Sequence, residues 1–301
     1  MKKIILLLSV LALCITGCGN TKDNSKKRII CWGDSMTEGT GGEEYTFPIS
    51  LSEASGAEVI NYGVFGETTK CIAAREGANP QFTTDEFIIP ADCTPVEVTV
   101  SSEDGEWMEL LDFGNAGINP CTIGGIKGKW YRDDDLGRVF VRETPGEETV
   151  LPSGSPLVTF AMENKRKDDI WVIWSGNNEQ PETVDEVLKT IEWQKAMLKD
   201  AGVTEYIVVS LTSKAMLNEI DLINEMFKEE YGEHYFDLRS YALSDMLNDA
   251  GITPTEEDLK DIKEGNVPSS LRSDEVHGND EFYRLAGIKI YEKLKDIGSL
   301  N

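Results

Sequence analysis

From Arg28 onward, short apolar runs rich in β-branched residues alternate with segments that carry helix signals. Such alternation is typical of a parallel sheet covered by helices on both faces, because each crossover must return the chain to the same edge of the sheet. Helix patterns that close at glycine support the same reading. We therefore predict five strands, at 29–32, 58–62, 170–174, 206–211 and 235–238, and helices from Pro48 to Gly56 and at 184–201, 215–231, 240–248 and 280–297.

The stretch from about Asn79 to Phe160 breaks this rhythm. Alternating runs at 96–100 and 138–142 are separated by turn signals such as Pro145-Gly146, which is typical of a small antiparallel sheet or barrel. We predict a β-rich module at 79–160, inserted between the second and third strands. The α/β domain then comprises residues 28–78 and 161–301.

The N-terminus carries the signals of an exported protein. Lys2 and Lys3 precede an apolar run at 4–15, which is too short for a spanning helix of roughly 20 residues. The small residues before Cys18 resemble a bacterial lipobox. This resemblance predicts a signal peptide at 1–17, lipid on Cys18, and a polar tether at 18–27, so that the protein is secreted and anchored to the membrane of the bacterial cell envelope.

Composition limits the partners and cofactors of the chain. The 54 acidic and 29 basic residues give a formal charge of -25, which repels phosphate backbones and argues against nucleic acid as a partner. No cysteine cluster has metal-ligand spacing, and the chain has only two histidines, His234 and His277, so we expect no metal site and no cofactor. An oxidising exterior permits disulfides, and Cys93 and Cys121 are the first pair to consider, although sequence leaves the connectivity open.

The first predicted strand ends in Gly33-Asp34-Ser35, which places Ser35 at the edge where open α/β sheets bind ligands. A serine at this position is suited to act as a nucleophile. An isolated Gly-Asp-Ser is more often a turn with a serine cap, so this tripeptide alone decides little.

Three further segments follow in order. Gly66 lies after the second strand, Gly176-Asn177-Asn178-Glu179 follows the third, and Asp274-Glu275-Val276-His277 precedes the last helix. With Gly33-Asp34-Ser35 they resemble the four sequence blocks of the SGNH (GDSL-like) hydrolases, over residues 28–75 and 165–298. Glu179 stands where an aspartate is usual, which leaves open whether that loop keeps the family geometry.

The resemblance implies a three-layer α/β/α fold with a flavodoxin-like five-stranded parallel sheet. It also implies a catalytic triad in which Ser35 is the nucleophile, His277 the general base, and Asp274 the residue that orients the histidine ring. The implied oxyanion hole is formed by the backbone N–H groups of Ser35 and Gly66 and by the side-chain amide of Asn178.

The function expected from this site is that of a serine esterase acting on short-chain acyl esters, O-acetyl groups on extracellular carbohydrate above all, through an acyl-Ser35 intermediate. An acyltransferase or a lipase or lysophospholipase using the same site is an alternative. A non-catalytic glycan-binding surface lipoprotein is an alternative of another class. Sequence leaves open the acyl chain, the leaving alcohol, the module's role, the envelope type and the oligomeric state.

Several aromatic and acidic residues have two readings. Trp107, Trp130 and Tyr131 suit either a sugar-binding face or the core of the module, and we expect core. The run at 133–135 suits a hairpin turn better than a Ca²⁺ loop. We expect Trp174 to belong to the core strand, although its place near Gly176 could let it line an acyl pocket, and we assign His234 to structure or surface.

Overall fold

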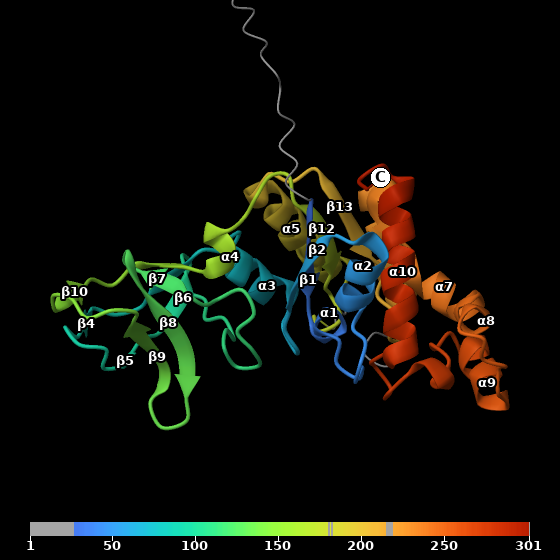
Figure 1. Ribbon diagram of the computed structural model, residues 1–301, viewed down its shortest axis with the longest axis horizontal. Helices are drawn as coiled ribbons and strands as arrows, with labels where there is room; N and C mark the ends of the chain where they lie inside the picture. The colour runs from blue at the N-terminus through green and yellow to red at the C-terminus, as the bar shows by residue number, and fades with distance from the viewer. Residues whose placement is uncertain (1–26, 180, 182, 215–218, 301) are drawn as a thin grey trace, which may run out of the picture.

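The computed structural model describes residues 27–179, 181, 183–214 and 219–300. Its central sheet is parallel and has five strands in the spatial order β14-β13-β12-β1-β2 (Figure 1). Numbered along the chain, this is the order 2-1-3-4-5 of flavodoxin-like sheets, so the predicted fold class is confirmed. The strands are β1 (Arg28–Gly33), β2 (Glu58–Gly63), β12 (Ile170–Trp174), β13 (Glu205–Val209) and β14 (Tyr235–Phe236).

The two central strands are buried along almost their whole length. All five residues of β12 and five of the six in β1 are buried, as expected where helices cover both faces of a sheet. The last two strands end earlier than predicted. Leu211 forms both of its backbone hydrogen bonds with the side chain of Asn224, and Asp237 caps the following helix, so neither residue continues a strand.

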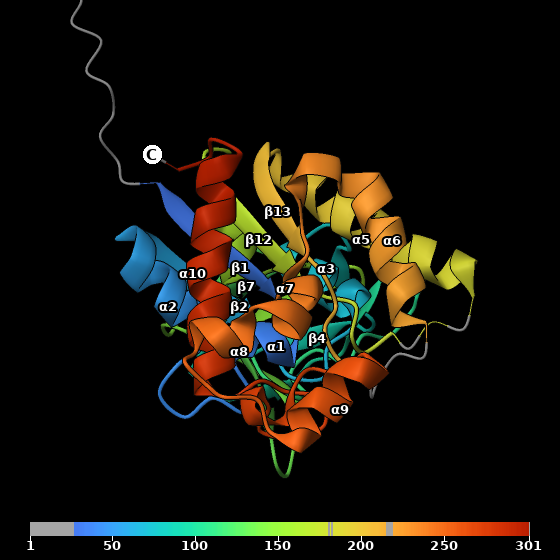
Figure 2. The same ribbon diagram turned by 90° about the vertical axis from the view of Figure 1, so that its right-hand side faces the viewer.

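Helices cover both faces of this sheet (Figure 2). On one face α2 (Phe47–Ser55) packs on α10 (Asp280–Asp296) so closely that a Cβ at Gly287 would lie 2.6 Å from the Phe47 carbonyl. The other face carries α3 (Thr69–Glu76), α5 (Val184–Ala201) and α6 (Ile220–Tyr231). Residues 215–218, the predicted start of α6, lie outside the described residues.

Shorter helices lie at the ends of the strands. The single helix predicted at 240–248 is two helices, α7 (Leu238–Ser244) and α8 (Met246–Asp249), and α9 (Glu256–Glu264) was not predicted. The remaining helical segments are α1 (Ser35–Glu38), α4 (Phe160–Glu163), η1 (Gly232–His234) and η2 (Ser269–Leu271).

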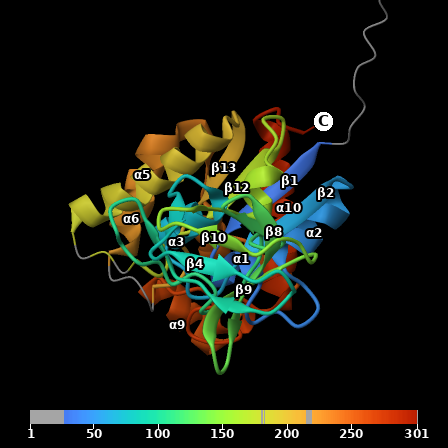
Figure 3. The same ribbon diagram turned by 90° about the vertical axis from the view of Figure 1, so that its left-hand side faces the viewer.

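Nine short strands lie between α3 and α4, in the stretch predicted to be an inserted module (Figures 1 and 3). Seven of them form an antiparallel sheet in the order β5-β9-β8-β7-β11-β3-β6, and β10 pairs with β4. A second hydrophobic core lies under these strands. The strands are β3 (Gln81–Thr83), β4 (Phe87–Ile89), β5 (Val96–Glu97), β6 (Val100–Ser102), β7 (Cys121–Ile123), β8 (Ile126–Asp133), β9 (Gly137–Arg142), β10 (Thr149–Leu151) and β11 (Pro156–Val158).

The aromatic residues of the β-module divide between core and surface. Trp130 is fully buried in its core, as expected, and donates its indole N–H to the Val98 carbonyl. Trp107 is 46% exposed, so the prediction that it belongs to the core is wrong. The Asp133 carboxylate accepts the N–H groups of Asp135 and Leu136, which makes 133–136 a hairpin turn, as predicted.

Two further predictions concern the cysteines and the N-terminal segment. No disulfide links the described residues, and Cys93 and Cys121 are both free, Cys93 on the surface and Cys121 buried. Within the same residues no helix has the length and apolar character needed to span a bilayer. The predicted signal peptide, Cys18 and nearly all of the tether lie outside the described residues.

Candidate active site

Ser35 begins a short helix directly after the central strand β1. Asp34 is the N-cap of α1, and its carboxylate accepts the Met36 N–H at 3.0 Å. A Cβ at Gly33 would lie 2.1 Å from the Trp174 carbonyl oxygen, so the neighbouring strand requires glycine there. The sharp exit from the strand places the Ser35 hydroxyl at the carboxyl edge of the sheet, with the residue 5% exposed.

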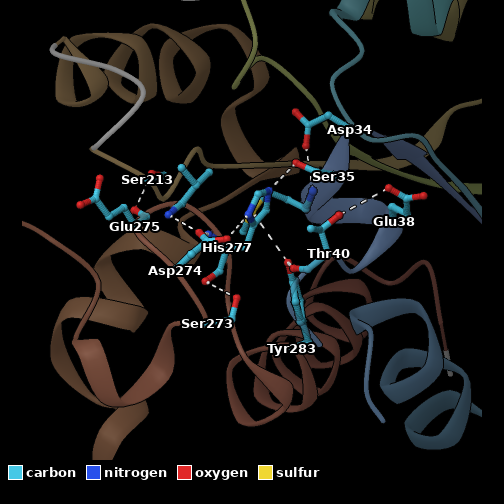
Figure 4. A network of polar contacts seen from close by, with 12 residues as sticks. Asp34, Ser35, Glu38, Thr40, Ser213, Ser273, Asp274, Glu275, His277 and Tyr283 are labelled. Atoms are coloured by element: carbon cyan, nitrogen blue, oxygen red, sulfur yellow. Dashed lines mark hydrogen bonds and ion pairs between the residues drawn. The ribbon is translucent and has the colours of Figure 1, made fainter. Parts of the chain in front are cut away.

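His277 connects Ser35 to Asp274 (Figure 4). Its Nε2 lies 2.9 Å from the Ser35 Oγ, and its Nδ1 lies 2.8 Å from the Asp274 Oδ2. The other Asp274 oxygen accepts the backbone N–H groups of Val276 and His277. Desolvation opposes ionisation of Asp274, but the hydrogen bonds donated by His277 and Val276 outweigh it and hold the pKa of this carboxyl below its usual value. The structure therefore brings together all three residues predicted to form the triad.

The loop that carries Asp274 and His277 is packed against the loop after α1. A Cβ at Gly41 would lie 2.0 Å from the Ser273 Oγ, so only glycine lets the two loops approach this closely. The Tyr283 hydroxyl, from α10, donates to the Thr40 carbonyl at 2.7 Å (Figure 4). Ser35 and His277 are thus fixed relative to each other by backbone packing as well as by their own hydrogen bond.

The predicted oxyanion donors lie on the loops after three neighbouring strands. Among the described residues, neither the Ser35 N–H nor the Gly66 N–H has a hydrogen-bond acceptor. Gly66 has a φ of 73°, which favours glycine. The Asn178 amide donates one N–H to the Glu67 carbonyl at 2.9 Å, and its second N–H has no acceptor among the described residues.

Glu179, the departure from the family pattern, has a structural partner. Its Oε1 accepts the backbone N–H of Thr69, the first residue of α3, at 2.5 Å. Burial raises the pKa of Glu179, and hydrogen bonds from Thr69 partly oppose this. The glutamate therefore joins the Asn178 loop to the helix that follows Gly66.

A buried ion pair that was not predicted from the sequence lies directly after Gly66, on the loop that follows β2, which we call the oxyanion loop. The Arg75 Nε lies 2.7 Å from the Glu67 Oε2, and both side chains are essentially inaccessible to solvent. The two remaining guanidinium nitrogens donate to the carbonyls of Ala116, in the β-module, and of Tyr62. The sequence offered little signal for this pair, because α3 also carries the charged residues Lys70 and Glu76.

The Asp258 carboxylate, which was not predicted from the sequence, supports the segment that leads into the loop of Asp274 and His277. The buried Asp258 carboxylate, on α9, accepts hydrogen bonds from Thr255, Ser269 and Ser270. The signal for it was the pattern Thr255-x-x-Asp258, a capping box that opens a helix.

The other residues singled out from the sequence lie away from the chemistry. Trp174 is fully buried between Phe47 and Phe282, so the idea that it lines an acyl pocket is wrong. His234 stacks on Tyr206 with ring centroids 4.2 Å apart, in a structural role. No group of three or more metal-binding side chains occurs among the described residues.

The four sequence blocks thus meet at one edge of a sheet with flavodoxin-like strand order, and Ser35, His277 and Asp274 are hydrogen-bonded in series. This is the arrangement that the resemblance to the SGNH hydrolases implies. No protein-family model matches the sequence, and a search of curated proteins finds no significant match.

Three solved structures are similar to this chain, all at low sequence identity. A G-D-S-L family lipolytic protein from Desulfitobacterium hafniense DCB-2 has a TM-score of 0.44 and 16% identity, over 89% of this chain and 99% of its own. A gut microbial diltiazem-metabolizing enzyme has a TM-score of 0.45 and 10% identity, over 90% of this chain and 47% of its own. A peptidoglycan O-acetylesterase has a TM-score of 0.38 and 12% identity, over 90% of this chain and 91% of its own.

Proposed function

We propose that this protein is a serine esterase that hydrolyses short-chain acyl esters, with an O-acetyl group on extracellular carbohydrate as its substrate. The observation that carries the proposal is the series of hydrogen bonds from Ser35 through His277 to Asp274, at 2.9 and 2.8 Å. The preference for carbohydrate rests on the resemblance to the SGNH hydrolases, many of which remove small acyl groups from sugars.

The reaction follows from the positions of these groups. The Ser35 Oγ attacks the ester carbonyl carbon as its proton passes to the His277 Nε2, and Asp274 stabilises the resulting imidazolium. The N–H groups of Ser35, Gly66 and Asn178 then stabilise the negative charge on the carbonyl oxygen. When the C–O bond breaks, His277 gives its proton to the leaving alcohol. Water, deprotonated by the same histidine, then attacks the acyl carbon, and the bond to Ser35 Oγ breaks as His277 returns the proton to Oγ, which releases the carboxylic acid.

Hydrolysis of activated acetyl and octanoyl esters by the purified protein tests this proposal. We expect the acetyl ester to be preferred, and Ser35→Ala and His277→Ala each to lower kcat by about 10⁴-fold or more, because the triad acts as a unit. His234→Ala and Ser244→Ala are matched controls away from the site and should keep full activity. An inactive parent protein, or activity that survives both triad substitutions, would contradict the proposal.

We further propose that lipid on Cys18 holds this esterase on the cell envelope, since the predicted lipobox ends at that residue. The protein expressed in a bacterial host should partition into detergent and carry the mass of a diacylglyceryl cysteine at its N-terminus. Cys18→Ser should abolish both properties. A Cys18→Ser protein that still partitions into detergent would refute lipid anchoring at this position.

A further inference from the structure

Two exposed aromatic side chains flank the candidate catalytic groups. Phe65, on the loop after β2, is 43% exposed, and its ring centroid lies 6.1 Å from that of His277. Phe113, from the segment between β6 and β7 of the β-module, is 47% exposed and lies edge-on to Phe65 at 6.0 Å. A Cβ at Gly66 would lie 3.2 Å from the Phe113 ring. The two rings therefore form an apolar wall beside both the histidine and the oxyanion loop.

The segment that carries Phe113 is fixed on the α/β domain. Gly114 packs on Val64, where a Cβ would lie 3.0 Å from the valine side chain, and the Ala116 carbonyl accepts a hydrogen bond from Arg75 at 2.6 Å. These contacts hold the aromatic ring at the site instead of leaving it on a free loop.

Backbone strain occurs in the same segment. Leu111, two residues before Phe113, has a φ of 69° and is 7% exposed, a conformation that costs a bulky residue about 1–3 kcal/mol. Asp112 is held by ion pairs with Arg132 and Arg138. Strain of this kind persists where the surrounding contacts enforce it, and it often accompanies a functional site.

The proton transfer that the reaction requires indicates which part of the substrate contacts the rings of Phe65 and Phe113. His277 must reach the leaving alcohol to protonate it, so a ring beside His277 flanks the alcohol rather than the acyl group. An aromatic face suits the C–H face of a sugar ring. The net charge of -25 disfavours an anionic glycan, so we consider a neutral one.

We propose that Phe65 and Phe113 form a binding site for the neutral pyranose ring of an O-acylated sugar, so that the β-module completes the substrate site of the esterase. This inference rests on the proposed function, because it places the sugar as the leaving alcohol.

Binding measured in the Ser35→Ala protein tests the inference without requiring hydrolysis. The probes are mono-O-acetylated methyl glucopyranoside, xylopyranoside and 2-acetamidoglucopyranoside, titrated by calorimetry. Phe113→Ala and Phe65→Ala, each added to Ser35→Ala, should weaken binding of at least one probe by about 3- to 10-fold, the size expected of one aromatic contact. Phe113→Tyr in the same Ser35→Ala protein keeps an aromatic ring and should bind the probe as tightly as Ser35→Ala alone. Leu136→Ala, an equally exposed apolar residue at the β8–β9 hairpin, is the matched control and should change nothing.

Kinetics in the active protein, with Ser35 intact, distinguish an effect on sugar binding from an effect on the acyl group. Phe113→Ala should raise KM for the bound pyranoside by a similar factor while leaving ethyl acetate, which has no ring, unchanged. The inference is overturned if none of the three pyranosides binds, if Phe113→Ala leaves binding unchanged, or if the substitution alters the preference between acetyl and octanoyl esters of one alcohol. Loss of hydrolysis in the parent protein, with binding intact, would instead contradict the proposed function alone.

Discussion

Asp34 places a carboxylate directly beside the candidate nucleophile and fully out of water. One oxygen accepts the Met36 N–H at 3.0 Å, and the other accepts the Asn177 amide at 2.9 Å. Burial raises the pKa of Asp34 from its usual 3.8 to about 6, because two hydrogen bonds compensate only part of the lost hydration. The charge at this position therefore costs stability at neutral pH.

We predict that Asp34→Asn gains stability relative to the parent as pH rises. Between pH 3.8 and about 6 the folded protein holds a proton on Asp34 that the unfolded chain releases, so this group's contribution to stability falls as pH rises through that window. The difference between the two proteins should shift by about 2 kcal/mol between pH 4 and pH 8, in favour of the variant.

Urea unfolding of both proteins at pH 4 and pH 8 measures this shift. A difference that does not change with pH would show that Asp34 ionises normally.

Residues that lie in local motifs could be predicted, and long-range partners could not. Ser35, Asp274 and His277 each belong to a short segment whose order along the chain is informative, and the structure places Ser35 and Asp274 within hydrogen-bond distance of His277. Asn177 meets Asp34 across 143 positions of sequence, and a single sequence contains no signal of such a pairing. Glu179 was recognised as a departure, but its partner on α3 required the fold.

At the scale of elements, α9 acts as a support for the loop that carries the histidine. Asp258 accepts five hydrogen bonds, two of them from Thr255 at its own helix start and three from Ser269 and Ser270 of η2. Asp261 adds an ion pair to Arg272 at 2.8 Å. At β13 a side chain also replaces a regular element: Asn224 takes both backbone hydrogen bonds of Leu211, so the strand ends two residues earlier than predicted.

We predict that Asp258→Ala lowers the free energy of unfolding by about 3 kcal/mol, because buried donors lose their acceptor. It should also lower kcat more than it changes KM, since the loop that it supports positions His277. Glu257→Ala, an exposed neighbour in the same turn, is the matched control.

The pH dependence of this contribution has the opposite sign to that of Asp34. Desolvation opposes ionisation of Asp258, but hydrogen bonds from Ser270 and Thr255 hold its pKa well below the usual value of 3.8. Its stabilisation is present above that value and is lost as pH falls below it. Urea unfolding at pH 7 and pH 3 should show the penalty of Asp258→Ala shrinking in acid, and a constant penalty would contradict this account.

In the whole molecule, the α/β domain and the β-module each have a hydrophobic core of their own. One lies around the parallel sheet and the other within the β-module. The sequence predicted both parts, because their apolar periodicities differ, but it did not show how they join. Arg75 lies at the junction: its guanidinium binds Glu67, the Tyr62 and Ala116 carbonyls, and lies 5.6 Å from the centroid of the Trp32 ring.

We predict that Arg75→Met lowers the free energy of unfolding by about 3–5 kcal/mol, because it leaves the Glu67 carboxylate buried without its partner. Burial already raises the pKa of Glu67 despite the opposing charge of Arg75. The loss should therefore be smaller at pH 5 than at pH 8, since the unpaired carboxyl can take up a proton.

The double variant Glu67→Gln/Arg75→Met separates the lost ion pair from the lost packing. It should recover part of the stability lost in Arg75→Met, because no uncompensated charge stays buried. If the guanidinium also positions Gly66 and Phe113, kcat should be below that of the parent protein in both variants. Arg284→Met, which breaks a partly exposed ion pair with Glu281 on α10, is the matched control and should change stability by no more than about 0.5 kcal/mol. Equal, small losses for Arg75→Met and Arg284→Met in urea unfolding would show that the junction between the two cores does not depend on this ion pair.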